Sequence, residues 1–194
     1  QHVGQDRQGR HRRAPAGQPA DEVDHNVVDA LRDNLDQIPF DLFSLNVMRG
    51  RDVGLGTLNQ VRKDLMASDS PYIQEAIELS DEDLSPYTSW QDFQNRNGLS
   101  NAVIAQFIAA YPDLKLTSQS QYDAFVGANG DDDIEDSDEP GVLGVVSGVN
   151  RVDLWVGGLA ERHINDGMVG STFWVVLHEQ FDRLQEGDRF YYLD

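Results

Sequence analysis

Apolar residues recur at helical spacing in several segments of the chain. In residues 21–38 they fall at every third or fourth position, and Pro39 predicts the end of that helix. Ser100 predicts an N-cap for a helix over residues 100–111 that stops before Pro112. Further helices are predicted over residues 60–67, 72–79, 88–95, 118–126 (ending at Gly127) and 169–184. The pattern therefore predicts a mainly α fold.

Two other apolar patterns stand out. In the last predicted helix, the apolar positions form one stripe of Val169, Phe173, Leu177, Phe181 and Leu184. The longest strand-like run is the Val-rich piece at residues 142–149. No internal repeat is apparent, so we expect one domain or part of one.

The net charge of the chain argues against some classes of binding partner. The formal net charge is −19, which argues against nucleic-acid binding and against docking on anionic lipid. There is no Cys, hence no disulfide, and no apolar run is long enough to cross a membrane. Residues 1–20 are instead basic and poor in apolar residues. We interpret them as a disordered tail or a reading-frame artefact, with a basic arm for an acidic partner as the alternative, and place a domain at residues 21–194.

An acidic run at residues 129–140 is a candidate calcium loop, because clustered carboxylates suit this ion. Counted from Asp131, however, the sixth and twelfth places of an EF-hand hold Asp136 and Val142 instead of Gly and Glu. We therefore predict a solvated loop. The sequence HEQFD begins like a zinc-protease helix at His178, but Asp182 stands where the second His belongs, so no metal site is predicted.

Residues 45–55 read LNVMRGRDVGL and place charges in an apolar stretch. One interpretation is structural: Asp52 pairs with Arg49 or Arg51. The other is functional: a guanidinium faces a buried anion, for which its planar, permanently charged fork is suited. Asn46 fits the second interpretation, since its amide oxygen can accept from the ring N–H of a histidine and so orient a metal ligand.

The surrounding residues, DLFSLNVMRGRDVGLGTLNQVR, resemble the signature of the animal-type heme peroxidase superfamily. VDLWVGGLAE, GMVGSTF and EQFDRLQEGDRFYY then resemble its C-terminal stretch, in the same order. The resemblance covers about residues 20–194. It implies the C-terminal portion of a helical heme peroxidase domain, from a bacterial member whose parent protein is secreted.

The resemblance also implies roles for these residues. Asn46 hydrogen-bonds the proximal histidine of the heme iron, and Arg49 lies near a heme propionate. Arg51 and Asp52 are scaffold charges that hold the turn. The proximal His, the distal His and the catalytic Arg belong to segments upstream of residue 1. None of the five histidines of this chain matches them.

The implied function is heme-dependent reduction of hydrogen peroxide, coupled to oxidation of an unknown electron donor. We expect this chain alone to be inactive and to expose apolar faces that the N-terminal part of the same domain would cover. Val53 and Leu58 replace the usual His and Tyr of the signature, which bears on packing or substrate access. Two alternatives stay open: a fatty-acid dioxygenase of the same family, and a non-catalytic helical module whose acidic loop binds calcium or a basic partner.

Overall fold

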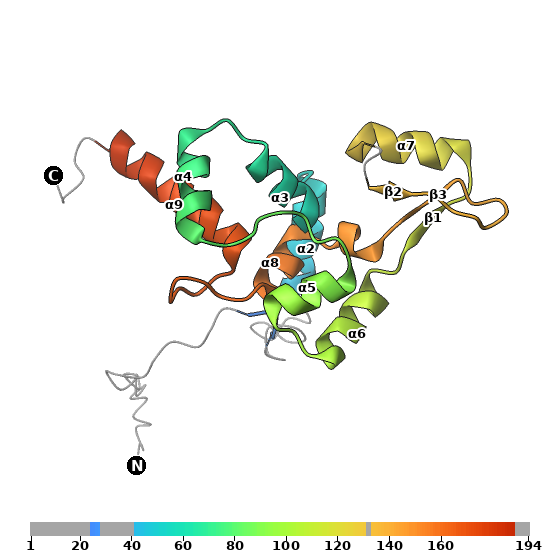
Figure 1. The fold of residues 1–194 in the computed structure, drawn as a ribbon, viewed down its shortest axis with the longest axis horizontal. Helices are drawn as coiled ribbons and strands as arrows, with labels where there is room; N and C mark the ends of the chain where they lie inside the picture. Colours follow the sequence, from blue (N-terminus) through green and yellow to red (C-terminus); the bar gives the residue numbers. More distant parts are fainter. Residues whose placement is uncertain (1–23, 28–40, 131–132, 189–194) are drawn as a thin grey trace, which may run out of the picture.

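Helices predominate in the computed structural model, which describes residues 24–27, 41–130 and 133–188 (Figure 1). The helices are α2 (Leu42–Asp52), α3 (Leu58–Met66), α4 (Pro71–Ser80), α5 (Trp90–Asn97), α6 (Asn101–Ala110), α7 (Gln119–Asn129), the 3-10 helix η1 (Gly148–Arg151), α8 (Leu154–Ala160) and α9 (Ser171–Gly187). The strands are β1 (Leu114–Leu116), β2 (Ile134–Glu135) and β3 (Gly144–Val146). The prediction of a mainly α fold is confirmed.

Most predicted helices are present, with two corrections. Of the helix predicted over residues 21–38, the structure describes only residues 24–27, and these are not helical. The remaining positions of that prediction lie outside the described residues. Helix α7 runs through Gly127, where the sequence predicted its end, and stops at Gly130. Gly130 has φ +83°, a conformation that glycine adopts without strain, whereas Gly127 stays helical.

The Val-rich piece forms only a short strand, β3, because the chain turns into η1 directly after it. β3 is the middle strand of a three-stranded antiparallel sheet with the order β1-β3-β2, in which Leu114 and Ile134 both lie opposite Val146. The sequence pattern missed β1 and β2, since strands of three and two residues carry no periodicity.

Serine and threonine caps fix where several helices begin. The side chain of Ser100 accepts from the backbone N–H of Val103, as predicted, and Thr57 caps α3 in the same way. On α6, Ile104 and Phe107 are buried, but Ile108 is 45% exposed. The apolar spacing of this helix would place Ile108 on the same face as Ile104 and Phe107, but the core covers Ile104 and Phe107 and leaves Ile108 largely open.

Two apolar clusters hold the helices together. In the first, the rings of Tyr87, Phe93 and Phe107 meet edge to face, with centroids 4.8 Å and 5.3 Å apart, around the buried Leu58 and Val152. The second lies between α3, α4 and α9 and consists of Leu65, Ala76, Leu84 and Val175. Leu58, which replaces the signature Tyr, is thus a core residue with 1% exposure.

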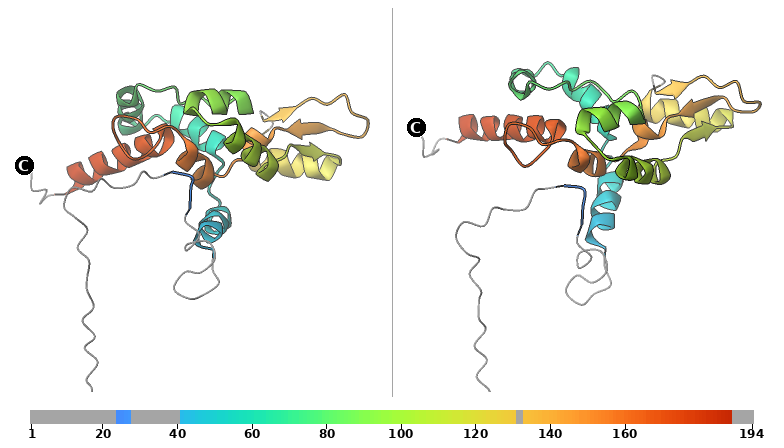
Figure 2. Two further views of the ribbon diagram at one scale, coloured as in Figure 1. Left: turned by 90° about the horizontal axis from the view of Figure 1, so that it is seen from below. Right: turned by 60° about the horizontal axis from the view of Figure 1, so that its bottom comes forward.

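Helix α2 stands apart from this body. Figure 2 shows it projecting from the remaining helices in both views, and none of its residues is buried. Its contacts with other elements of the described chain are mainly with α8. Its orientation therefore depends on a few contacts at one end.

We predict that Gly148→Ala destabilises the fold. A Cβ at this position would lie 1.8 Å from the backbone oxygen of Tyr111, which cannot move without displacing α6 from the aromatic cluster. We expect a loss of about 3 kcal/mol in the free energy of unfolding, measured by urea titration. Gly127→Ala is the matched control, since its Cβ would meet nothing within 4 Å. Equal stability of both variants would contradict the prediction.

Candidate functional site

Local sequence explains why the predicted site residues lie on α2. Asp41 caps this helix by accepting from the backbone N–H of Ser44 at 3.0 Å and from its hydroxyl at 2.8 Å. The helix ends at Val53 and Gly54, whose N–H groups donate to the carbonyls of Arg49 and Arg51. Gly54 has φ +73°, as expected of a residue just after a helix.

Asn46 and Arg49 lie one turn apart on α2. Asn46 is half-buried and borders a small recess with Gly50 and Trp155, where α2 meets α8. Arg49 is exposed. Neither side chain forms a hydrogen bond or ion pair with any other described residue. An amide and a guanidinium are therefore both available to a group that approaches this side of the helix.

These side chains fit the group that the sequence implied. A half-shielded amide can accept from an imidazole N–H, and a free guanidinium can pair with a carboxylate. The described histidines lie elsewhere: His25 and His163 border another pocket, and Nδ1 of His178 lies 2.8 Å from the carboxylate of Asp182. None of these three borders the recess beside Asn46.

Arg51 does not pair with Asp52, which corrects one of our predictions. Its Nε and Nη2 donate to the two carboxylate oxygens of Asp153, at 2.8 Å and 2.7 Å. Asp52 is exposed and forms no ion pair within the described part of the chain. Arg51 is still a scaffold charge, but it joins α2 to the start of α8, 102 positions away, and does not hold the local turn.

The carboxylate of Asp153 is held from two sides. The hydroxyl of Tyr111 donates to Oδ2 of Asp153 at 2.7 Å, the oxygen that also accepts from Nη2 of Arg51. Burial alone would raise the pKa of Asp153, but the hydrogen bonds from Arg51 and Tyr111 outweigh it and lower this pKa below its ordinary value. Burial, followed by the bond to Asp153, raises the pKa of Tyr111. The carboxylate therefore stays ionised and the phenol stays protonated at neutral pH.

The most buried charges in the structure are Arg62 and Glu161, which sequence reasoning did not assign to any role. Their side chains are 0% and 1% exposed, and Nη1 of Arg62 lies 2.6 Å from Oε1 of Glu161. Arg62 also donates to the carbonyls of Asp83 and Ser85 and to the hydroxyls of Ser171 and Thr172. These contacts of its three guanidinium nitrogens tie α3 to the loop after α4 and to the start of α9.

Glu161 is equally well satisfied. It accepts from the hydroxyl of Tyr87 at 3.0 Å and from both the backbone N–H and the hydroxyl of Thr172. The bond to Thr172 places a carboxylate at the N-terminus of α9, where the helix dipole favours negative charge. Gly170 is required beside it, since a Cβ there would lie 2.2 Å from Cβ of Glu161.

The sequence did contain a signal for this pair. Arg62 ends the first matched segment and Glu161 ends the VDLWVGGLAE segment. That signal is only their place in the two matched segments; nothing in the sequence indicates that an Arg and a Glu 99 positions apart form an ion pair. Only the fold brings them together, so sequence reasoning treated them as part of a resemblance without a role.

We predict that Glu161→Ala lowers the free energy of unfolding by about 3–5 kcal/mol, because Arg62 would be left charged and unpaired in the core. Urea denaturation followed by circular dichroism measures this loss. Glu139→Ala is the control: it removes an exposed pair with Lys115, in which both side chains are 53% exposed, and should cost less than about 1 kcal/mol. A similar loss in both variants would contradict this account.

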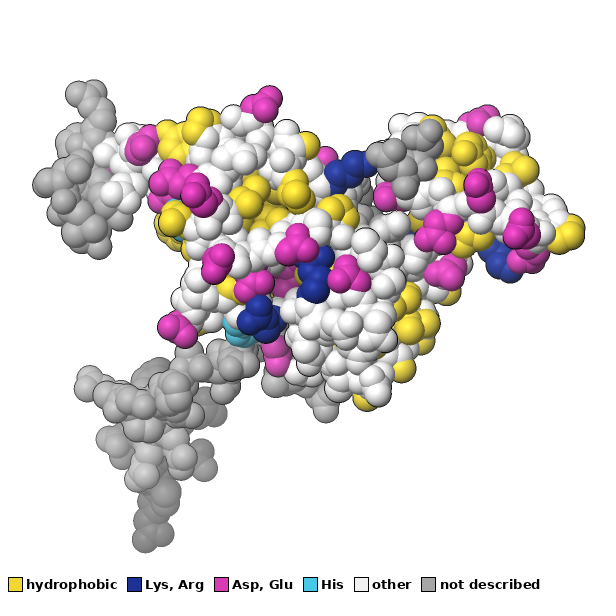
Figure 3. Space-filling model, in the orientation of Figure 1, with side chains coloured by type: hydrophobic (Ala, Val, Ile, Leu, Met, Phe, Trp, Pro, Cys, Tyr) yellow, Lys and Arg dark blue, Asp and Glu magenta, His cyan; other side chains and the backbone are white. Residues whose placement is uncertain are grey.

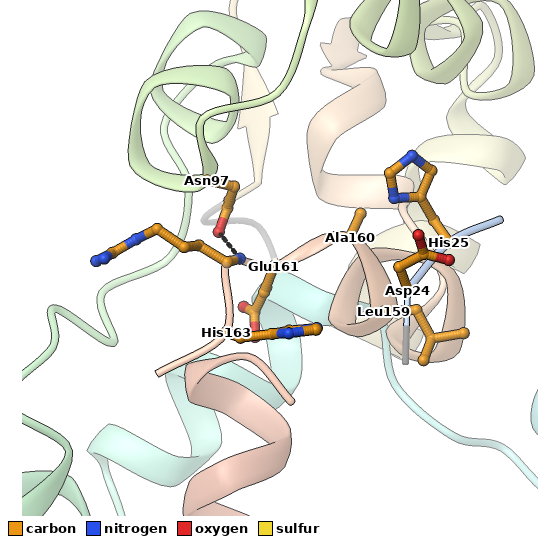
Figure 4. A pocket seen from close by; sticks show the side chains of 8 residues that line it. Asp24, His25, Asn97, Leu159, Ala160, Glu161 and His163 are labelled. Atoms are coloured by element: carbon orange, nitrogen blue, oxygen red, sulfur yellow. Dashed lines mark hydrogen bonds between the residues drawn. The ribbon is translucent and has the colours of Figure 1, made fainter. Parts of the chain in front are cut away.

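A polar pocket of about 370 Å³ lies on the other side of Glu161 (Figure 4). It is bordered by Asp24 and His25 of the described N-terminal segment, by Leu159 and Ala160 of α8, and by His163. The side-chain oxygen of Asn97 accepts from the backbone N–H of Arg162 beside it, at 3.0 Å. Within the described residues, no group of His, Asp or Glu side chains is placed to hold a metal ion, here or elsewhere.

An apolar trough of about 260 Å³ lies between α8 and α9. It is bordered only by apolar side chains, among them Trp155, Phe173 and Leu177. The stripe predicted on the last helix continues beyond it: Phe181 is 67% and Leu184 is 63% exposed. The stripe therefore faces outward in this chain and not into its core, in line with the expectation of exposed apolar faces. Trp155 also borders the recess of Asn46, so the two surfaces are continuous.

Acidic side chains outnumber basic ones on the visible surface. Figure 3 shows Asp and Glu over both the helical body and the sheet end, with few Lys and Arg among them. Against this background, an exposed Arg49 with no ion-pair partner among the described residues is unusual. No helix in the described part of the chain is long and apolar enough to span a membrane.

Comparison with known proteins identifies the family of the chain. The family described as "Animal haem peroxidase" matches residues 10–146 and 144–194. The chain therefore belongs to the animal haem peroxidase family.

Individual relatives support this assignment. Peroxidasin homolog pxn-2 of Caenorhabditis elegans is 25% identical over 174 residues, which are 90% of this chain and 9% of that protein. Peroxidasin of Drosophila melanogaster is 26% identical over 178 residues, 90% of this chain and 8% of that protein. Peroxinectin A of Dictyostelium discoideum is 50% identical over 44 residues, 23% of this chain and 8% of that protein. The chain thus spans less than a tenth of the length of these relatives, and no solved structure matches it.

Proposed function

We propose that this chain is the C-terminal part of a peroxidase domain and forms the proximal side of its heme site. Asn46 accepts a hydrogen bond from the proximal histidine, which another part of the domain supplies. Arg49 pairs with a heme propionate. Heme, when bound, supplies the iron at which hydrogen peroxide is reduced while an electron donor is oxidised. The proposal includes a bacterial origin and a secreted parent protein, as the resemblance implied.

One observation carries this proposal. Three polar residues of the signature, Arg51, Asn59 and Arg62, are engaged by other residues of the chain. Asn46 and Arg49 have no such partner among the described residues, although they belong to the same signature and share α2 with Arg51. The amide of Asn46 is not sealed from solvent, so it and the guanidinium of Arg49 can both meet a group that is supplied from outside this chain.

The chemistry of the two side chains explains what each would contribute. An amide oxygen that accepts from one imidazole nitrogen leaves the other nitrogen free to bind metal, fixes the ring orientation and strengthens the ligand. A guanidinium stays charged at any relevant pH and orients a carboxylate through two parallel hydrogen bonds. Asn46 would thus tune the iron through its ligand, and Arg49 would set the position of the cofactor.

Ferric heme together with free imidazole tests these roles in the chain as it exists, because imidazole replaces the side chain of the proximal histidine. We expect Arg49→Ala to weaken heme binding about tenfold, since one charge-assisted contact is lost. We expect Asn46→Ala to weaken imidazole binding to the chain-bound heme about tenfold, the loss typical of a residue that orients a metal ligand. Both constants are measured by optical titration of the heme absorption.

Matched controls separate specific from general effects. Lys115→Ala removes an exposed cation on β1, and Asn95→Ala removes an exposed amide on α5. Neither should change either constant. If Arg49→Ala and Asn46→Ala also leave both constants unchanged, the proposal fails.

We also predict that the chain with ferric heme oxidises a donor at the expense of hydrogen peroxide no faster than free ferric heme does. No described histidine borders the recess beside Asn46, and a positioned acid–base group usually contributes about 10²–10⁴-fold. Steady-state oxidation of a chromogenic donor measures the rate. Turnover at least ~100-fold above free heme would show a complete site in this chain and contradict the proposal.

A further inference from the structure

We infer that Asp153 is a positioning residue of the heme site: held by Tyr111, it sets the orientation of α2 through Arg51 and so fixes where Asn46 and Arg49 lie. The inference rests on the proposed function of those two residues. Asp153 borders the recess beside Asn46, but its carboxylate is already bound by Arg51 and Tyr111, so it acts through the fork of Arg51.

Helix α2 needs such an anchor. It buries none of its own residues and projects from the body of the molecule (Figure 2). An amphipathic helix is normally oriented by the apolar face that it buries, and α2 lacks that constraint within the described residues. A directional polar contact can replace it, because hydrogen bonds to a planar guanidinium fix both distance and angle.

The Arg51–Asp153 contact has the required geometry. It is a two-pronged fork, with both bonds between 2.7 Å and 2.8 Å. Exposed ion pairs usually contribute little, and the side chain of Arg51 is 64% exposed. However, the side chain of Asp153 is only 15% exposed and also accepts from Tyr111, so its carboxylate is already oriented before Arg51 meets it.

The backbone of Asp153 is equally fixed. Its carbonyl accepts from the N–H of Gly157 at 2.9 Å, which begins α8, and the residue forms a β-bridge with Thr57, the N-cap of α3. The preceding Val152 is 1% exposed, and its carbonyl accepts from the N–H of Leu58 at 2.8 Å. The fork therefore connects α2 to the rigid centre of the fold.

The position of Arg51 on α2 determines what the fork controls. At about 100° per residue, Arg51 points about 160° away from Arg49, so holding one side of the helix turns Arg49 outward. Asn46 lies five residues before Arg51, which is about 7.5 Å along the helix axis. A tilt of about 10° at the anchor would then move Asn46 by roughly 1 Å, enough to break a hydrogen bond to a fixed ring.

Amide hydrogen exchange of α2 tests the anchor in the chain without heme. We expect Asp153→Asn and Arg51→Ala each to speed exchange in α2 about tenfold, while exchange in α4 and α9 stays unchanged. The double variant should be no faster than either single one, since both remove the same contact. Tyr111→Phe should give a smaller increase. Lys115→Ala, which breaks an exposed ion pair on β1, is the control and should have no effect.

Arg51→Lys keeps the inference testable if Asp153→Asn does not fold, because it retains the charge at an exposed position and loses only the fork. It should also speed exchange in α2. Unchanged exchange in α2 on loss of the fork, or additive effects of Arg51→Ala and Asp153→Asn, would overturn the inference.

Heme titration in the presence of imidazole then tests positioning itself. Asp153→Asn should weaken heme binding about as much as Arg49→Ala, roughly tenfold, although the carboxylate that it removes is already bound by Arg51 and Tyr111. If α2 exchanges faster but heme binds as before, Asp153 anchors the helix without positioning the site, and the inference is overturned while the proposed function stands. If the unsubstituted chain binds no heme, the proposed function fails, and the positioning role of Asp153 fails with it. The exchange data would then report only on the anchor of α2.

Discussion

The ion pair between Arg62 and Glu161 is the contact on which the rest of the structure depends. It is fully buried and joins α3, the loop after α4, the segment after α8 and the N-terminus of α9. Two charges removed from water cost several kcal/mol each, and the pair is tolerable because all three guanidinium nitrogens and both carboxylate oxygens have hydrogen-bond partners. The chain must therefore reach one arrangement of these four elements, and that arrangement positions Asp153 and the base of α2.

The signature residues divide into two groups by whether other described residues bind them. Arg51, Asn59 and Arg62 are bound by distant parts of the chain and hold elements together, as when Asn59 accepts from the N–H of Tyr87 and donates to its carbonyl. Asn46 and Arg49 have no partner among the described residues and lie on a helix with no fully buried residue. One short stretch of sequence thus serves both the stability of the fold and the proposed site, and the fork of Arg51 is the link between them.

Local patterns predicted much of the helical content, since caps and apolar periodicity are properties of neighbouring residues. Ser100 and the spacing within α6 are examples. Short elements were missed: α8 contains two glycines in seven residues, and β1 and β2 are too short for a pattern. The site was predictable only in part. The roles of Asn46 and Arg49 rest on residue chemistry and resemblance and stay predictions. The expected partner of Arg51 was wrong, because Asp153 lies far along the chain whereas Asp52 lies next to it. In the HEQFD segment, which begins like a zinc-protease helix, His178 contacts Asp182 one turn further along the helix. The solvated acidic loop stays a prediction, because residues 131–132 lie outside the described residues.

The most direct test of the central claim is to map where heme contacts the chain. Ferric heme is paramagnetic and broadens the nuclear magnetic resonance signals of nearby amides. With heme and imidazole added to the isotopically labelled chain, we predict selective loss of intensity for residues 46–53 and for the indole of Trp155, which borders the same recess. Signals from α4 and α7 should remain. Broadening confined to the apolar trough of α9, with sharp signals throughout α2, would contradict the claim that Asn46 and Arg49 face the heme.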